Sequence, residues 1–205
     1  MNFNILASQA SIEKTIKSLK ENNFEPIEVD SKEEALAKIL ELIPGGASVM
    51  NGSSVTLQEI GYIDFLKNGK HKWNNLHDAI LAESDKEKQA LLRKQSVLSD
   101  FYLGSAHALT EEGEIMIASN SGSQLPHLVF TSPNTILVVG AQKIVPTLPD
   151  AFRRVKEHVI PLEDERMRGV YGFGTMLAKT LILHKENAAM GRKIYIILVK
   201  EILGF

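Results

Sequence analysis

The chain has 205 residues with 23 basic and 25 acidic side chains and a net charge of −2, so no broad positive field exists to attract nucleic acid. It has no cysteine, which excludes disulfides, thiolate zinc sites, iron–sulfur clusters and cysteine nucleophiles in this chain. Hydrophobic residues at 44% and charged residues at 23% are typical of a globular protein, and the length fits one domain over residues 1–205.

The N-terminal segment has neither a basic stretch nor a sustained apolar core, so it does not resemble a signal peptide. The chain also has no apolar run of the roughly 20 residues that are needed to cross a bilayer. We therefore expect a cytoplasmic protein without membrane insertion.

Short apolar strands alternate with amphipathic helices along the chain. Ile12, Ile16 and Leu19 recur at helical spacing, and Ser31 with Glu34 has the form of a capping box that opens a second helix. The expected helices cover 11–22, 31–43, 84–98 and 150–158, and the expected strands cover 25–29, 47–50, 101–103, 115–118, 135–139, 181–183 and 193–200.

The alternation of strands and helices implies βαβ units and therefore an α/β fold with a largely parallel, doubly wound sheet. The strands are apolar on both alternations, as a sheet covered on both faces requires. In the helix over 150–158 we expect Ala151, Phe152 and Val155 to point inward and Arg154 to point outward. Ligands of such sheets bind outside the carboxyl ends of the strands, so the residues that follow each strand are the candidates for a site.

The first candidate segment follows the strand over 47–50 and leads into another helix. Gly52 allows a tight turn, while Ser53, Ser54 and Thr56 offer hydroxyl groups beside a helix N-terminus that favours an anion. We expect a phosphate or carboxylate to bind there. The alternative is that Ser53 or Ser54 only caps the helix, a role in which serine is common.

The second candidate segment follows the strand over 101–103. Gly104 and Ser105 begin it, and Glu111 is the carboxylate that we select as catalytic, because a carboxylate in a partly dry loop can act as a base or a nucleophile. For Glu112 and Glu114 we favour a solvated hairpin turn.

Two further loops add candidates. Asn120 and Gly122 lie in a small polar loop whose backbone amides could approach a ligand, although a plain loop is an alternative. Gly140 and Lys143 follow the strand over 135–139, where the lysine would neutralise an anionic substrate unless it is a solvated surface side chain. The histidines lack the spacing of metal ligands, so we expect no metal site; only His107 lies within a candidate loop.

Three of these motifs, 52–61, 104–113 and 136–145, resemble in sequence and in order those of the LUD-domain family, the lactate-utilisation group of LutC/YkgG-like proteins. The tail over 200–205 and the helix beginning at 151–155 resemble those of its short, stand-alone members. The resemblance covers nearly the whole chain.

The resemblance implies a fold similar to the NagB/RpiA/CoA-transferase group, in which a glutamate of CoA transferases is the nucleophile and Glu111 is the comparable residue here. It implies a role in oxidation of lactate, with a small anionic metabolite (a hydroxy or keto acid, a phosphate or a CoA-linked molecule) and iron–sulfur proteins as partners. A homo-oligomer is a further option, and no cofactor is evident. The alternatives are a non-catalytic accessory or sensor subunit and, less favoured, a nucleotide-dependent enzyme of the folate cyclo-ligase kind.

The chain departs from the family pattern at two polar positions. Gln124 stands where the family commonly has arginine, and Gln142 stands where it often has asparagine. Without the arginine, strong carboxylate or phosphate binding at that corner is in question.

Overall fold

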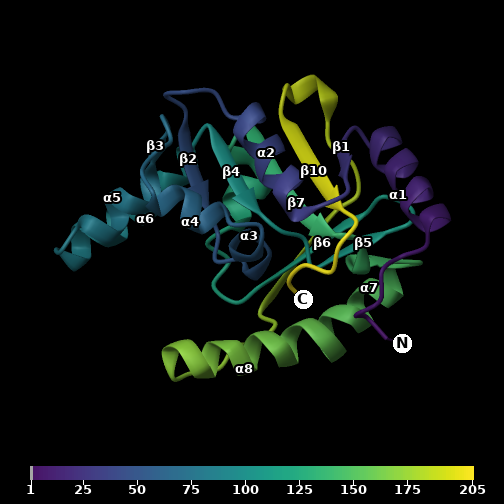
Figure 1. Cartoon of the computed structure of the whole chain (residues 1–205). Coiled ribbons are helices and arrows are strands. Elements are labelled where there is room, and N and C mark those ends of the chain that lie inside the picture. The colour runs from purple at the N-terminus through teal and green to yellow at the C-terminus, as the bar shows by residue number, and fades with distance from the viewer. Residues whose placement is uncertain (1) are drawn as a thin grey trace.

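The computed structural model describes residues 2–205 and contains two sheets (Figure 1). The larger sheet has six parallel strands, and its strand order places β7 and β4 at the centre. In spatial order the strands are β1 (Glu25–Val29), β10 (Lys193–Val199), β7 (Asn134–Gly140), β4 (Phe101–Gly104), β2 (Ser48–Asn51) and β3 (Asn74–Asn75). This confirms the α/β fold with a mainly parallel central sheet.

The smaller sheet has mixed strand directions. In spatial order it contains β8 (Ile144–Val145), β5 (Ala108–Thr110), β6 (Ile115–Ser119) and β9 (Lys179–Leu183). β6 is antiparallel to both of its neighbours. The sequence predicts β6 and β9 as strands but not their separate sheet, because apolar strands of either sheet look alike in sequence. It misses β5, which has only three residues.

The helices begin and end largely at the capping residues that the sequence offers. Ser8, Ser31 and Thr147 each accept a hydrogen bond from a backbone amide of the helix that follows. The helices are α1 (Gln9–Glu21), α2 (Lys32–Leu42), α3 (Val55–Glu59), α4 (Tyr62–Lys67), α5 (Leu76–Ala82), α6 (Lys86–Gln95), α7 (Leu148–Arg154) and α8 (Ile160–Tyr171). Among residues 2–205, none of them combines the length and the apolar character of a membrane crossing.

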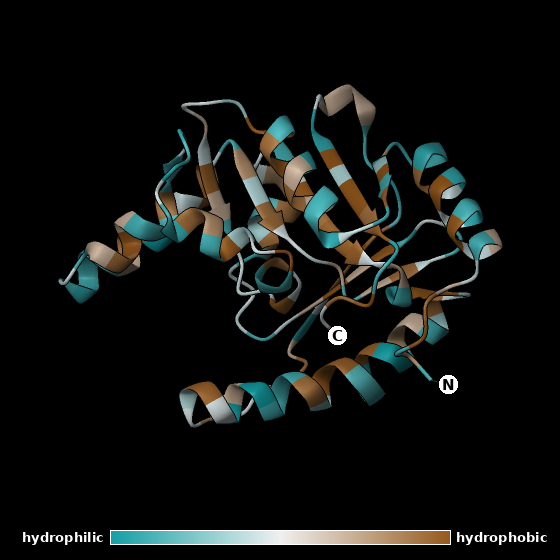
Figure 2. Ribbon diagram, viewed as in Figure 1, coloured by the Kyte–Doolittle hydropathy of each residue, from teal (hydrophilic) through white to brown (hydrophobic). Residues whose placement is uncertain are grey.

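Alternate residues of the central strands enter two separate cores. Ile136 and Val138 of β7 pack with apolar side chains of α2, α3 and α4. Leu137 and Val139 face the other way, toward α1 and the smaller sheet. The larger sheet therefore lies between a helical layer on one face and α1 with the smaller sheet on the other, and Figure 2 shows its apolar strands enclosed by helices that are polar outside.

The helix expected over 150–158 is longer than predicted, and one of its side chains points the other way. It continues through a π-helical segment, Val155–Val159, into α8, because the chain passes Pro161 without stopping. Proline lacks the amide hydrogen that a regular turn needs, and a π-type widening is one way to absorb that loss. Arg154, expected to point outward, is fully buried on the same face as Ala151 and Val155.

The hairpin turn between β5 and β6 packs directly on α1. Gly113 lies in this turn with φ +80°, a left-handed conformation that suits glycine. A Cβ atom at this position would lie 2.8 Å from the carbonyl carbon of Ser18 and 2.9 Å from the amide nitrogen of Leu19. The backbone of α1 can approach the turn because residue 113 has no side chain.

We expect Gly113→Ala to lower the free energy of unfolding by about 1–3 kcal/mol, because it combines a left-handed alanine with a backbone clash. Urea denaturation measures this loss. Gly46→Ala is the matched control, since Gly46 has φ +88° and open space around its Cβ position. Equal losses in the two variants would show that the contact with α1 contributes nothing.

Candidate functional site

The two candidate loops that begin at Gly52 and Gly104 lie next to each other at one edge of the larger sheet. β2 pairs with β4, with Asn51 opposite Leu103. The amide of Gly52 then donates to the carbonyl of Leu103 at 3.1 Å. The loop that begins at Gly52 and the loop that begins at Gly104 therefore leave the sheet side by side, at the carboxyl ends of the strands.

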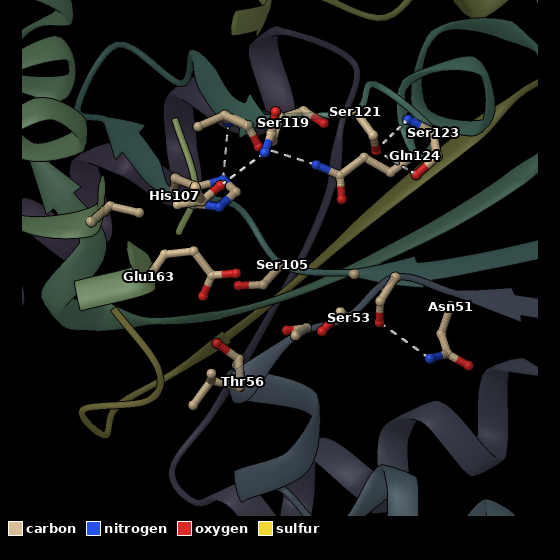
Figure 3. Close-up of a pocket in the computed structure, with 18 of the residues that line it drawn as sticks. Asn51, Ser53, Thr56, Ser105, His107, Ser119, Ser121, Ser123, Gln124 and Glu163 are labelled. Atoms are coloured by element: carbon tan, nitrogen blue, oxygen red, sulfur yellow. Dashed lines mark hydrogen bonds between the residues drawn. The ribbon is translucent and has the colours of Figure 1, made fainter. Parts of the chain in front are cut away.

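A cavity of about 450 Å³ lies beyond these strand ends. Figure 3 shows Ser53, Ser105 and Thr56 along one side and the Ser119–Gln124 loop along the other. The predicted site residues that line the cavity are Gly52, Ser53, Ser54, Thr56, Gly104, Ser105, Asn120 and Lys143. The structure thus gathers most of the predicted residues around one hollow.

Two predicted glycines lie outside the lining. Gly122 is in the polar loop but packs against the aliphatic part of Lys179. Gly140 is behind the cavity, where a Cβ atom would lie 2.7 Å from the carbonyl oxygen of Glu201 and 2.8 Å from the amide nitrogen of Leu203. Both positions are constrained by close packing against the protein itself.

Glu111 does not lie with the other predicted site residues. β5 belongs to the smaller sheet and carries the chain away from the cavity toward α1. There the Glu111 carboxylate accepts a hydrogen bond from the Ser11 hydroxyl at 2.7 Å and lies 3.3 Å from the Lys14 amine. The predicted site with Glu111 beside the Gly52 and Gly104 loops is therefore corrected: in this structure the carboxylate holds the hairpin turn to α1.

Lys143 has the most unusual environment in the cavity. Its side chain is 2% exposed, and its amine donates to the Thr56 hydroxyl at 3.0 Å and to the Ser105 hydroxyl at 3.1 Å. Within residues 2–205 no carboxylate forms an ion pair with this amine. Burial, with a smaller contribution from the charge of Arg154, lowers the pKa of Lys143 to about 7.

Arg154 is a second buried cation behind the same loop. One of its terminal nitrogens donates to the carbonyl of His107 at 2.6 Å. Its Nε and its other terminal nitrogen have no hydrogen-bond partner in the described part of the chain. The sequence analysis predicts this side chain to lie in solvent. The spacing of Ala151, Arg154 and Val155, which is that of one helical face, is the signal that would have indicated its burial.

His107 lines the cavity as a neutral donor. Its Nδ1 accepts a hydrogen bond from the amide of Ala118 at 3.1 Å, so the remaining proton is on Nε2. Burial first, and then the charges of Lys143 and Arg154, lower the pKa of His107 to about 3. The imidazole is therefore uncharged at pH 7 and offers one N–H group.

An aromatic pair, which sequence reasoning missed, forms part of the cavity wall. The rings of Tyr102 and His127 stack with centroids 4.4 Å apart. Nδ1 of His127 is 2.9 Å from the Ser132 hydroxyl, and burial lowers the pKa of His127 to about 4. A Cβ atom at position 52 would lie 2.5 Å from the Tyr102 hydroxyl, so this pair also explains why Gly52 is a glycine.

Helix capping, the alternative role for Ser53 or Ser54, is observed for Ser54. The Ser54 hydroxyl accepts from the amide of Leu57 at 3.3 Å and caps α3. Ser53 is exposed and faces the cavity opening. The Ser53 hydroxyl is therefore free of this capping role, while the Ser54 hydroxyl keeps only its O–H donor and one lone pair.

α8 closes one side of the cavity with residues that the sequence did not mark as functional. Glu163 reaches toward the cavity in Figure 3 and accepts two hydrogen bonds from Arg166, both at 2.7 Å. Gln124, on the facing loop, donates to the carbonyl of Ala118 at 3.1 Å. A Glu–Arg pair three residues apart is common on helix surfaces, so its spacing carries no signal of a site.

Comparisons with known proteins identify the family and the fold of the chain. The model of the LUD domain matches residues 12–199. The chain belongs to the LUD domain family. A crystal structure of a DUF162 family protein from Deinococcus radiodurans has the same fold, with a TM-score of 0.58 and 14% identity over 95% of this chain and 99% of that chain. No match was found among curated proteins.

Within this LUD domain, the cost of burying Lys143 predicts a pH dependence of stability. The folded pKa of about 7 lies below the ordinary value of 10.5, so between these values the unfolded chain binds the extra proton. The free energy of unfolding is therefore expected to rise with pH above 7, by up to about 1.4 kcal/mol per pH unit. Urea denaturation from pH 6 to 9.5 measures it.

Lys143→Met should remove this rise, since methionine does not titrate. Lys17→Met is the control, because Lys17 is 77% exposed on α1 and its loss should leave the pH profile unchanged. If the free energy of unfolding rose with pH equally in wild type and in Lys143→Met, the rise would not come from Lys143.

Proposed function

We propose that this LUD domain binds a small anionic metabolite, with the carboxylate or phosphate of the ligand at the amine of Lys143. The observation that carries the proposal is the incomplete set of partners around this amine. An ammonium group has three N–H donors, and the hydroxyls of Thr56 and Ser105 accept two of them. The third is available to an acceptor in the cavity that Lys143 lines.

The charges around the cavity support an anion over a neutral ligand. A buried cation without a counter-charge is costly, and an anionic ligand would supply that charge. Arg154 adds a second buried positive charge nearby. The carboxylate of Glu163, which lines the cavity, is already neutralised by Arg166. The floor of the cavity therefore has an excess of positive charge.

The remaining donors fit the oxygens of a small organic acid. His107 offers a neutral N–H group, and Ser53, Ser119 and Asn120 offer side chains that can donate or accept. A 2-hydroxy or 2-keto acid has oxygens on adjacent carbons, which such a mixed set can bind together. These side chains come from several loops, so they can surround a ligand.

We further propose a LutC-like role in organic-acid metabolism, with lactate or its keto acid as the starting candidate. Membership of the LUD family supports this role. Oxidation of lactate to pyruvate releases two electrons, and in this proposal iron–sulfur partner proteins accept them, because this chain has no cysteine to hold a cluster. Assembly with further copies of the chain belongs to the same proposal.

Isothermal titration calorimetry with lactate, pyruvate and inorganic phosphate at constant ionic strength tests the anion site. We expect Lys143→Met to weaken binding by about 10- to 100-fold, since a hydrogen bond to a charged group is worth about 1.5–3 kcal/mol. Lys17→Met, remote from the cavity, should bind as wild type does. Absence of binding by all three anions would contradict the proposal and favour an accessory subunit without a ligand.

The pKa of Lys143 also predicts how binding depends on pH. Above about pH 7 the free amine loses its proton, so the affinity for lactate should fall, approaching tenfold per pH unit. Calorimetry at pH 8 in two buffers of different ionisation enthalpy should detect proton uptake on binding. Lys143→Arg keeps its charge, so its affinity should change little over this range. A flat wild-type profile would contradict the role of Lys143.

A further inference from the structure

The two ends of the cavity differ in chemistry. The floor carries Lys143, His107 and the hydroxyls of Thr56 and Ser105. The side formed by the last turn of the π segment, by α8 and by the segment after it carries five apolar residues beside Thr175 and the Glu163–Arg166 ion pair, whose charges neutralise each other. Its apolar lining residues are Val159, Ile160, Met167, Phe173 and Met176. A ligand that fills the cavity therefore meets polar groups at one end and hydrocarbon or thioether groups at the other.

Two of these apolar side chains are exposed although the fold holds their segment in place. Phe173 is 59% exposed and Met176 is 65% exposed. Between them, the amide of Thr175 donates to the carboxylate of Asp164 at 2.7 Å. The Thr175 hydroxyl accepts from the side chain of Asn120, a residue of the facing cavity wall, at 3.3 Å. The segment is thus tied both to α8 and to the opposite wall.

The size of the cavity also exceeds the needs of a three-carbon acid. A volume of about 450 Å³ falls within the range of about 300–1,000 Å³ that is usual for pockets of larger organic ligands. Lactate or pyruvate would fill the polar floor and leave the apolar side to water. A hydrocarbon group of a ligand would displace the water in contact with Phe173 and Met176, and this burial of apolar surface is favourable.

We propose that the ligand is an amphipathic carboxylate whose anionic head binds at Lys143 and whose alkyl or aryl tail lies along α8 against Phe173 and Met176. This inference rests on the proposed anion site and names the substrate class of that site. The exposed side chains line the same cavity as the amine, so the tail of one ligand reaches both ends. That continuity favours a ligand tail over a second protein chain as the cover for Phe173 and Met176.

The test is calorimetry with straight-chain 2-hydroxy carboxylates of increasing length, together with 3-phenyllactate, at fixed pH and ionic strength. Each methylene that becomes buried should raise the affinity by about threefold to fourfold. We expect lactate to be the weakest member of the series. An affinity that does not change with tail length, in a protein that binds lactate, would overturn this inference and leave the anion site standing.

Three variants separate the two ends of the cavity. In the double variant Phe173→Ser/Met176→Ser the gain with tail length should shrink while the affinity for lactate stays within about twofold of wild type. Lys143→Met should weaken binding of every member of the series by a similar factor. Val170→Ser is the matched control, because Val170 is 61% exposed on α8 and does not line the cavity.

Light scattering after size-exclusion chromatography tests whether a second copy of the chain, and not a ligand tail, covers Phe173 and Met176. Wild type and the double variant should have the same molar mass, as a ligand tail requires. If the double variant dissociates an oligomer and the affinity series does not change, a second copy of the chain covers these side chains and the inference is overturned. Failure of every ligand to bind, lactate and phosphate included, would remove the anion site and this inference together.

Discussion

The site depends on the hydrogen bonds of one buried amine. Thr56 follows β2, Ser105 follows β4 and Lys143 follows β7, and these three strands are neighbours in the larger sheet. The amine therefore ties together the carboxyl ends of three parallel strands. Two neutral hydroxyls are modest compensation for a desolvated ammonium group, and the pKa of the lysine falls accordingly. The fold keeps this charge short of a partner at a place where a ligand can reach it.

Within residues 2–205, no carboxylate forms an ion pair with Lys143. The carboxylate of Glu59, whose charge favours the protonated lysine, is also engaged by the amide of Gly204 at 2.6 Å. Arg154 acts in the opposite sense, since a second positive charge nearby disfavours protonation of the lysine. The hydrogen bond from its guanidinium group to the carbonyl of His107 joins α7 to the loop after β4. The Arg154 guanidinium thus both positions the backbone of His107 and adds positive charge behind the cavity floor.

Sequence reasoning located the floor of the cavity because the rule for parallel sheets is local. Residues directly after a strand lie at its carboxyl end, and this suffices to place Gly52, Ser105 and Lys143 together. It failed for Glu111, because the rule does not show that the chain enters another sheet after Gly104. The short strand β5 was not recognisable, so Glu111, which follows it directly, was misplaced relative to the cavity.

The contribution of the helices could not be predicted for a different reason. Arg154 was assigned to solvent by its charge, although its spacing from Ala151 matched the buried face. Glu163 and Arg166 lie on a helix that was expected to end near residue 158, since proline usually stops a helix. Where a helix crosses a cavity depends on tertiary packing, and no periodicity within the helix records it.

The elements that build the two ends of the cavity are held by different contacts. The floor is closed from behind by the C-terminal segment, where the side-chain amide of Gln142 donates to the carbonyl of Leu203 at 2.8 Å. Substitutions there would disturb the strand ends and the core. α8, in contrast, has no fully buried residue in the described chain, and ion pairs on its own surface fix its side chains. Under the proposed binding mode, changes along α8 therefore alter the contacts with the ligand tail and leave the amine proposed to bind the head unchanged, so head recognition and tail selectivity would vary separately on one scaffold.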